Sequence, residues 1–242
     1  MKRLWITGCD GFVAGTAVHQ SAALKDVEVH ALSLGPALAE REGLYWHTFD
    51  LLETETLHSL FKAHKPDAII HAAALADIDF CQSNQDMARR VNVGVTEEIA
   101  KLCGDNGVRM VVLSTDTVFD GKKSFYTEQD VPVPLNFYGE TKVAAEQAVI
   151  NNCPNHVVTR LSLVMGLPML CAGNSFLAKM LPVLEKGGEV GVPDNEIRTP
   201  VDVLTLSRAL LELAVAQDYC GFMHLAGCDA VSRWQMMQRV AE

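Results

Sequence analysis

The feature that most constrains the fold is a glycine-containing junction near the N-terminus, residues 7–15, with the sequence TGCDGFVAG. It follows a short apolar run, residues 4–7, and opens a helical pattern, residues 13–24. Glycines at a β–α junction permit a tight turn and close approach of the backbone to a phosphate group. The first helical turn adds free N–H groups and a partial positive charge. The junction therefore predicts a turn that binds the diphosphate of a dinucleotide.

Short apolar runs alternate with helical patterns along the rest of the chain, which is typical of βαβ units and a parallel sheet. We therefore expect an α/β fold with a Rossmann-type, doubly wound parallel sheet. The pattern loosens after Gly166, so we place a dinucleotide-binding domain at 1–166 and a smaller C-terminal lobe at 167–242, interleaved as one unit. Further strands are expected at 27–33, 67–71, 109–114, 157–163 and 221–226, and further helices at 55–64, 85–106, 138–151, 204–216 and 232–242.

Charge and cysteine usage exclude several classes of partner. The formal net charge is −10, and an acidic surface repels nucleic acid and anionic membranes. The seven cysteines are scattered without a Cys-x-x-Cys pair, which favours buried free thiols in a cytoplasmic protein over disulfides. No apolar run approaches transmembrane length. The eight histidines show no metal-ligand spacing, so no metal site is predicted, and His30, His71 and His224 are expected to be satisfied core residues.

Two positions bear on the nucleotide. The second strand ends at Ser33 without the carboxylate that usually accepts from the ribose of NAD, so we favour NADP(H), with NAD possible. Arg41 is close enough in sequence to approach a 2′-phosphate, although Ser33 could also simply end its strand. Asp50 follows a short apolar segment, where it could accept from the adenine amino group or cap a helix.

A second motif combines the end of one strand with the following helix. Tyr138 and Lys142 are four residues apart, so they share one helical face. A lysine ammonium lowers the pKa of a neighbouring phenol, and such a tyrosine can exchange a proton near neutral pH. Thr115 ends the preceding strand, where a hydroxyl can bond a substrate carbonyl oxygen. The alternative is that Tyr-x-x-x-Lys is only a solvated helix face.

Several sequence blocks together carry a family resemblance: the glycine turn, HAAA at 71–74, VNV at 91–93, STDTVFDG at 114–121, and PLNFYGETK at 134–142. They resemble the extended short-chain dehydrogenase/reductases, and within these the dTDP-4-dehydrorhamnose reductase branch, over essentially the whole chain. Thr117 and Leu163 stand where this branch usually has aromatic residues, and the chain ends at Glu242, earlier than family members usually do.

The resemblance implies roles for individual residues. Three groups follow from it and from the residues above. The catalytic residues are Thr115, Tyr138, Lys142 and Asn92, the last supporting a proton relay. The cofactor-binding residues are Gly8, Gly11, Phe12, Val13, Ser33, Asp50, Leu51, Ala72, Ala73, Ala74, Tyr138 and Lys142. The substrate-binding residues are Asp116, Asn136 and Arg160.

The expected activity is NADP(H)-dependent reduction of a keto group on a nucleotide-activated sugar. Two alternatives stay open. One is a sugar-nucleotide epimerase or dehydratase, which Asp116 beside Thr115 would suit. The other is a non-catalytic, NADP(H)-binding regulatory subunit similar to methionine adenosyltransferase β. The family also implies a homodimer that packs through the helices at 85–106 and 138–151.

Overall fold

The computed structural model describes residues 1–171, 173, 175–216 and 218–241. Its centre is a seven-stranded sheet in the order β10-β6-β5-β4-β1-β2-β3, and every neighbouring pair is parallel. The strands are β1 (Lys2–Thr7), β2 (Val27–Ser33), β3 (Leu44–Thr48), β4 (Ala68–His71), β5 (Arg109–Thr115), β6 (His156–Leu161) and β10 (Gly221–Leu225). This is the Rossmann-type α/β fold that the sequence predicts.

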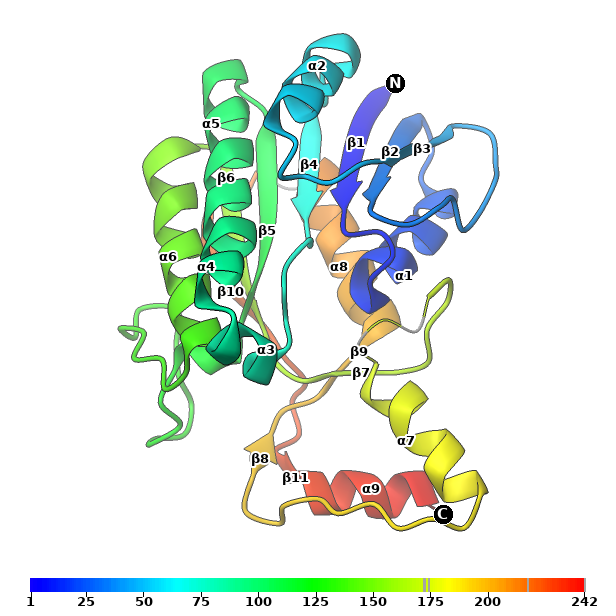
Figure 1. Cartoon of the computed structure of the whole chain (residues 1–242), viewed down its shortest axis with the longest axis vertical. Coiled ribbons are helices and arrows are strands. Elements are labelled where there is room, and N and C mark those ends of the chain that lie inside the picture. Colours follow the sequence, from blue (N-terminus) through cyan, green and yellow to red (C-terminus); the bar gives the residue numbers. More distant parts are fainter. Residues whose placement is uncertain (172, 174, 217, 242) are drawn as a thin grey trace.

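Helices cover both faces of the sheet (Figure 1). Along β1, Leu4 and Ile6 belong to one buried cluster while Trp5 belongs to the other, as the two-residue period of a strand requires. One face is covered by α1 (Phe12–Gln20) and α8 (Val203–Val215), and the other by α2 (Thr54–His64), α5 (Thr96–Asn106) and α6 (Phe137–Asn152).

The order of the strands reverses at β1. The chain runs from β1 outward to β2 and β3, then crosses back to β4 on the other side of β1 and continues to β5 and β6. In open α/β sheets, ligands bind in the crevice beyond the carboxyl ends of the strands at such a switch point. The glycine junction after β1 and the loop after β4 both lie at this place.

Elements after residue 166 divide between the sheet and a small lobe. The helix α8 and the strand β10 join the main sheet layers, and β7 (Val164–Met165) pairs with β9 (Val201–Asp202). The lobe contains α7 (Phe176–Glu185), β8 (Ile197–Arg198), β11 (Val231–Ser232) and α9 (Arg233–Ala241). It hangs below the carboxyl ends of the central strands (Figure 1).

Three features differ from the sequence prediction. The edge strand β3 and the helix α7 were not predicted, and α7 contains Pro182. The predicted helix at 85–106 is not continuous: it comprises α4 (Gln85–Ala88), a π-helical segment η2 (Arg89–Val95) and α5, and a short helix α3 (Ile78–Ser83) precedes it. Short 3₁₀ turns η1 (Ser21–Ala23) and η3 (Asp116–Val118) complete the elements.

Candidate active site

The glycine junction forms the predicted tight turn. Gly8 has a φ of 71°, and a Cβ on it would lie 2.8 Å from the backbone N and Cα of Ala73, so only glycine fits there. Gly11 donates its N–H to the carbonyl of Gly8 at 2.8 Å and is the N-cap of α1. The first turn of α1, which begins at Phe12, contains no acidic residue. Its free N–H groups therefore face the turn with a positive partial charge, which suits a diphosphate.

A later segment of the chain lies against this turn. A Cβ on Gly173 would be 2.5 Å from the backbone N of Phe12 and 3.2 Å from the carbonyl carbon of Gly11. Leu170 approaches the same helix at Gly15, with 3.6 Å between its Cβ and the position of a Cβ on that glycine. Nothing in the sequence pattern indicated this contact. Gly173 therefore lies against the start of α1, next to the turn that a diphosphate would use.

A chain of buried hydrogen bonds links the turn to the helix layer behind it. The Oγ1 of Thr7 is 2.8 Å from Nδ1 of His71, and Nε2 of His71 is 3.0 Å from Oγ1 of Thr96. Thr96 donates its own proton to the carbonyl of Asn92 at 2.7 Å, so it must accept from His71 Nε2–H. Thr7 then donates to Nδ1, and its oxygen accepts from the N–H groups of Ala72 and Ala73 at 3.2 Å each. This pattern requires neutral His71, in agreement with burial, which lowers its pKa to about 3.

Asn92 lies in the π-helical segment and is completely buried. Its Oδ1 accepts from the N–H of Leu75 at 2.8 Å, and its Nδ2 donates to the carbonyl of Leu75 and to Oγ1 of Thr141, each at 3.0 Å. Thr141 in turn donates to the carbonyl of Tyr138 at 2.7 Å. Asn92 therefore fixes the loop after β4 against α6, and its part in a proton relay stays a prediction.

The predicted Thr–Tyr–Lys set comes together at the end of β5 and the start of α6. The side chain of Thr115 lies close enough to Tyr138 to lower the pKa of its phenol, and the N–H of Thr117 donates to Thr115 Oγ1 at 3.2 Å. Asn136 caps α6, because its Oδ1 accepts from the N–H of Gly139 at 2.8 Å. Gly139 permits the close packing, since a Cβ there would lie 2.7 Å from the carbonyl oxygen of Thr117. The contact holds Tyr138 beside the strand end.

The pKa of Tyr138 is raised rather than lowered, and other groups than Lys142 set it. Burial raises the pKa of Tyr138 well above its ordinary value, the charges of Cys81 and Asp116 raise it further, and Thr115 opposes them only in part. Burial also lowers the pKa of Lys142 to about 8, while Glu146 opposes that change. At neutral pH the phenol is thus protonated and the lysine mostly charged.

Glu146, which the sequence analysis missed, lies one turn beyond Lys142 and organises this part of the core. It accepts from Ser114 Oγ at 2.5 Å and forms a bidentate pair with Arg160, with Nε at 3.0 Å from Oε1 and Nη2 at 2.8 Å from Oε2. Both side chains of the pair are at most 4% exposed. The helical spacing from Tyr138 and Lys142 could have indicated Glu146, since positions four residues apart share a face.

Most of the Arg160 guanidinium makes structural contacts, and its substrate role stays a prediction. The guanidinium carbon lies 5.1 Å from the ring centroid of Phe119 and 4.3 Å from that of Phe222. Two of its nitrogens bind Glu146, while the buried Nη1 has no partner in the described part of the chain. His224 was predicted as a satisfied core residue, yet its buried Nε2 also has no partner among the described residues. Both side chains line a cavity.

That cavity has a volume of about 830 Å³ and lies between the sheet and the lobe. Its wall includes Asp116 and Asn136, two of the predicted substrate residues, together with Arg160, Arg198 and His224. Asp116 Oδ2 is 3.1 Å from Nη1 of Arg198, so its charge is partly balanced. Burial nevertheless raises the pKa of Asp116, and Arg198 opposes that effect.

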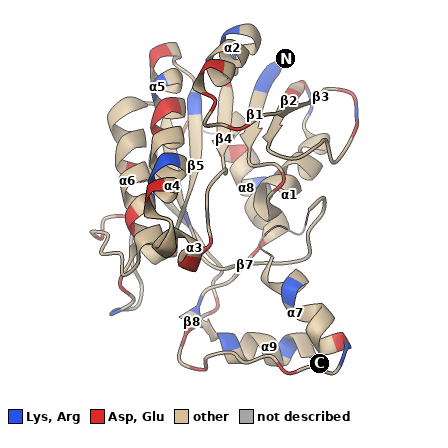
Figure 2. Cartoon of the chain, in the orientation of Figure 1, with Lys and Arg blue, Asp and Glu red and all other residues tan. Residues whose placement is uncertain are grey.

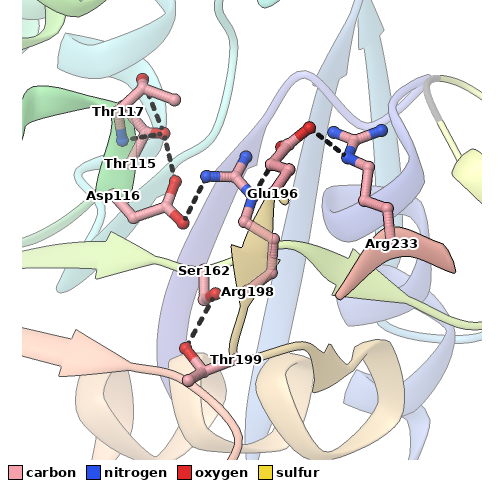
Figure 3. A network of polar contacts seen from close by, with 8 residues as sticks. All are labelled: Thr115, Asp116, Thr117, Ser162, Glu196, Arg198, Thr199 and Arg233. Carbon is pink, nitrogen blue, oxygen red and sulfur yellow. Dashed lines mark hydrogen bonds and ion pairs between the residues drawn. The ribbon is translucent and has the colours of Figure 1, made fainter. Parts of the chain in front are cut away.

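An ion-pair chain connects this wall to the lobe (Figure 3). From Asp116 it runs through Arg198 to Glu196, with 3.2 Å between Arg198 Nε and Glu196 Oε1, and on to Arg233, whose Nε is 2.9 Å from Glu196 Oε2. Basic residues on β8, α7 and α9 are visible across the lobe in Figure 2. The lobe thus brings cations next to the loop that follows Thr115.

The predicted nucleotide-selecting residues are held by local contacts. Ser33 Oγ donates to the carbonyl of Gly35 at 2.7 Å, and Arg41 Nη2 donates to Oγ of Ser21 at 2.7 Å, so Arg41 does not extend towards Ser33. Asp50 accepts from the N–H of Leu52 at 2.9 Å. The alternative that Asp50 caps α2 is wrong, because the N-cap is Glu53. Leu51 packs against the core beneath α2 and α5.

The parallel sheet with its switch point, the glycine turn, and the Thr–Tyr–Lys arrangement define an extended short-chain dehydrogenase/reductase fold. Comparisons with known proteins narrow this class. The family model described as the RmlD substrate binding domain matches residues 1–242, and the chain belongs to this family.

Relatives of two different kinds are similar to this chain over most of its length. The dTDP-4-dehydrorhamnose reductase of Sinorhizobium fredii is 32% identical over 238 residues, which are 95% of this chain and 74% of that protein. Methionine adenosyltransferase 2 subunit beta of Rattus norvegicus is 29% identical over 245 residues, covering 100% of this chain and 72% of its own length. The crystal structure of a dTDP-4-dehydrorhamnose reductase from Clostridium acetobutylicum has a TM-score of 0.86 at 25% identity, covering 98% of this chain and 79% of that one. Within the described residues, no helix is long and apolar enough to cross a bilayer.

Proposed function

We propose that the protein is an NADP(H)-dependent reductase that acts on a keto group of a nucleotide-activated sugar. The observation that carries the proposal is the placement of Tyr138 beside Thr115, at the carboxyl end of β5 and one helical turn from Lys142. This set lies next to the cavity, because the neighbours Asp116, Thr117 and Asn136 are in the cavity wall. A carbonyl oxygen placed there would meet both hydroxyl groups.

The roles of the chain's own residues follow from their protonation. Thr115 and Tyr138 would donate hydrogen bonds to the substrate oxygen, and Tyr138 would release its proton as negative charge develops there. Lys142, with a pKa of about 8, holds a charge that stabilises the resulting phenolate. A bound reduced nicotinamide supplies the hydride for this chemistry. Asn92 acts as a positioning residue, since it fixes α6 through Thr141.

The turn after β1 fits the diphosphate of such a cofactor. Gly8 leaves no room for a side chain against Ala73, and the N–H groups at the start of α1 face the turn. Leu170 and Gly173 lie against the start of α1, so a cofactor bound there would meet them. The absence of a carboxylate at the end of β2 supports NADP(H) over NAD(H).

The cations in the cavity wall support an anionic substrate. Arg160 and Arg198 both line the cavity, and a diphosphate there would lie beside two guanidinium groups. Arg160 Nη1 is buried without a protein partner among the described residues, and a buried donor without a partner costs about 1–3 kcal/mol. The cavity volume, about 830 Å³, also lies within the range of small-molecule sites.

The test begins with titration of the purified protein by NADPH and NADH, followed by a panel of 4-keto nucleotide sugars. We expect tighter binding of NADPH and turnover of at least one sugar. Tyr138→Phe should lower kcat by about 10²–10⁴-fold with cofactor affinity nearly unchanged. Tyr45→Phe is the control, because Tyr45 is 49% exposed on β3, at the opposite edge of the sheet. Full activity of Tyr138→Phe would overturn the assignment of the acid.

A second candidate is a non-catalytic regulatory subunit. The whole-length similarity to methionine adenosyltransferase 2 subunit beta favours it, and so does Gly173 beside the diphosphate turn. It predicts binding of NADPH and of a methionine adenosyltransferase catalytic subunit with no turnover of any keto sugar.

The epimerase or dehydratase alternative is less supported, because Asp116 is paired with Arg198 rather than free. Size-exclusion chromatography would test the predicted homodimer.

A further inference from the structure

Three histidines that are far apart in the sequence meet at the β3 edge of the sheet. His30 lies on β2, His47 on β3, and His64 is the last residue of α2. One side-chain nitrogen from each lies within 4.8 Å of the other two. Their spacings in the sequence are too long for a recognisable metal motif, so only the fold reveals the cluster. His30 is buried, while His47 and His64 are partly exposed, which leaves a path for an ion to enter.

The hydrogen bonds fix which nitrogen of His30 is free to bind a ligand. Its Nε2 is 2.8 Å from Oε1 of Glu28, and a carboxylate can only accept, so Nε2 carries the proton. Nδ1 therefore presents a lone pair, and it is 2.8 Å from Nε2 of His47. The planes of these two rings differ by only 5°, so the rings lie edge to edge and point their nitrogens at each other.

His64 is the third member of the group, and its ring is tilted relative to the other two. Its ring centroid is 4.6 Å from that of His30 and 5.3 Å from that of His47, and its plane is tilted by about 55° to both. Metal ligands must be neutral imidazoles with a free lone pair, and the bond of His30 Nε2 to Glu28 leaves such a lone pair on Nδ1.

We infer that His30, His47 and His64 form a binding site for a divalent transition metal, with zinc the best match, and that Glu28 supports it through His30. Three imidazoles and one open position suit tetrahedral zinc, which needs nitrogens about 3.3 Å apart around bonds of about 2.0–2.1 Å. Small rotations of the partly exposed rings would bring them to this spacing. Binding breaks the His30–His47 hydrogen bond and moves the proton of His47 from Nε2 to Nδ1.

Two nearby charges act on the metal affinity in opposite directions. Glu28 supplies a carboxylate behind a ligating histidine, which orients the ring and raises its basicity. Arg3 opposes the cation, although its Nη1 is engaged with the carbonyl of His64 at 3.2 Å. Because the ligands come from β2, β3 and α2, the metal would fasten the edge strand to the sheet and its covering helix. The site is separate from the cavity, which lies towards β5, β6 and β10.

The experiment removes bound metal with a chelator and then titrates the full-length protein with Co²⁺ and Zn²⁺. We expect one equivalent of Co²⁺ with the visible absorption of tetrahedral coordination, displaced by Zn²⁺, and a higher Tm with metal. His64→Ala and His47→Gln should each abolish saturable binding, and Gln at position 47 can still donate to His30. Glu28→Gln should weaken binding by about 10–100-fold.

His58→Ala is the matched control, because His58 is a half-exposed histidine on the same helix that pairs with Glu98 instead. It should bind metal as the unmodified protein does. Absence of stoichiometric binding in the unmodified protein, or undiminished binding in a combined His47→Gln and His64→Ala variant with a native circular dichroism spectrum, would overturn the proposal.

Discussion

The centre of the sheet and the small lobe differ in how far their interacting polar side chains are buried. In the centre, Thr7, His71, Thr96 and Asn92 are at most 2% exposed, and hydrogen bonds join them in a chain. In the lobe, Arg198, Glu196 and Arg233 are between 22% and 36% exposed. The helix α7 has no buried residue.

Because of this difference, we expect the type of reaction and the choice of substrate to depend on different regions. The buried centre fixes the glycine turn and the Tyr138 helix in one arrangement, because the hydrogen bonds of His71, Thr96 and Asn92 each have a specific partner. The lobe contributes exposed ion pairs, which contribute little to stability and rearrange easily. Reaction type should therefore depend on the centre, whereas substrate choice should depend on the lobe and the cavity wall.

The largest expected effect comes from the buried pair at the edge of the centre. Glu146→Gln leaves the Arg160 guanidinium buried without a counter-charge, which should lower the free energy of unfolding by about 3–5 kcal/mol. Equilibrium unfolding in urea measures it. A loss below about 1 kcal/mol would show that this pair is solvated like those in the lobe.

A pair of glycine substitutions tests the same contrast. Gly8→Ala combines a positive φ with a Cβ only 2.8 Å from the backbone of Ala73, so we expect a loss of about 2–4 kcal/mol and no cofactor binding. Gly187→Ala in the lobe has a φ of 69° but open space around it, so only about 1 kcal/mol is expected. Thermal unfolding of both variants gives the comparison, and equal losses would contradict it.

The buried histidine makes the centre sensitive to acid. The pKa of His71 is lowered to about 3 in the folded protein from an ordinary value of 6.5, so between these values the unfolded chain binds the additional proton. Stability from this group is complete above pH 6.5 and falls with decreasing pH, by at most about 1.4 kcal/mol per pH unit. Unfolding free energies from pH 7 down to pH 4 should therefore fall less steeply in His71→Gln than in the unmodified protein. A His58→Gln control should keep the steep slope.

The smallest effect is expected in the lobe. Glu196→Gln removes the carboxylate between Arg198 and Arg233, yet all three groups face solvent in part, so the loss should stay within about 1 kcal/mol. The same variant removes one of the two carboxylates paired with Arg198, so its effect should appear in KM for an anionic substrate. An unchanged KM together with a large loss of stability would reverse the proposed division between centre and lobe.

Features of the fold that depend on residues close together in the sequence were predictable from it. The turn at Gly8 and the buried strands β1, β4 and β5 follow from glycine placement and apolar runs, which are local. The edge strand β3 was missed because Tyr45 and His47 leave it too polar for that pattern. The π-helical segment around Asn92 depends on contacts with Leu75 and Thr141, which the sequence does not reveal.

The candidate site shows the same limit. The spacing of Tyr138 and Lys142 indicated a shared helical face, and the structure confirms it. Their pKa values were not predictable, because burial, a property of the assembled fold, is the largest cause of both shifts. The partner of Arg160 and the meeting of three histidines likewise depend on tertiary packing.

The contact of Gly173 with Phe12 has a thermodynamic consequence for regulation. Suppose that residue 173 covers the glycine turn in one conformation and leaves the turn open in another. The apparent association constant of the cofactor then equals the intrinsic association constant multiplied by the fraction of molecules with an open turn. Any ligand of the lobe that stabilises the exposed conformation would then tighten cofactor binding. By reciprocity the cofactor would tighten that ligand by the same factor, even though the two never touch.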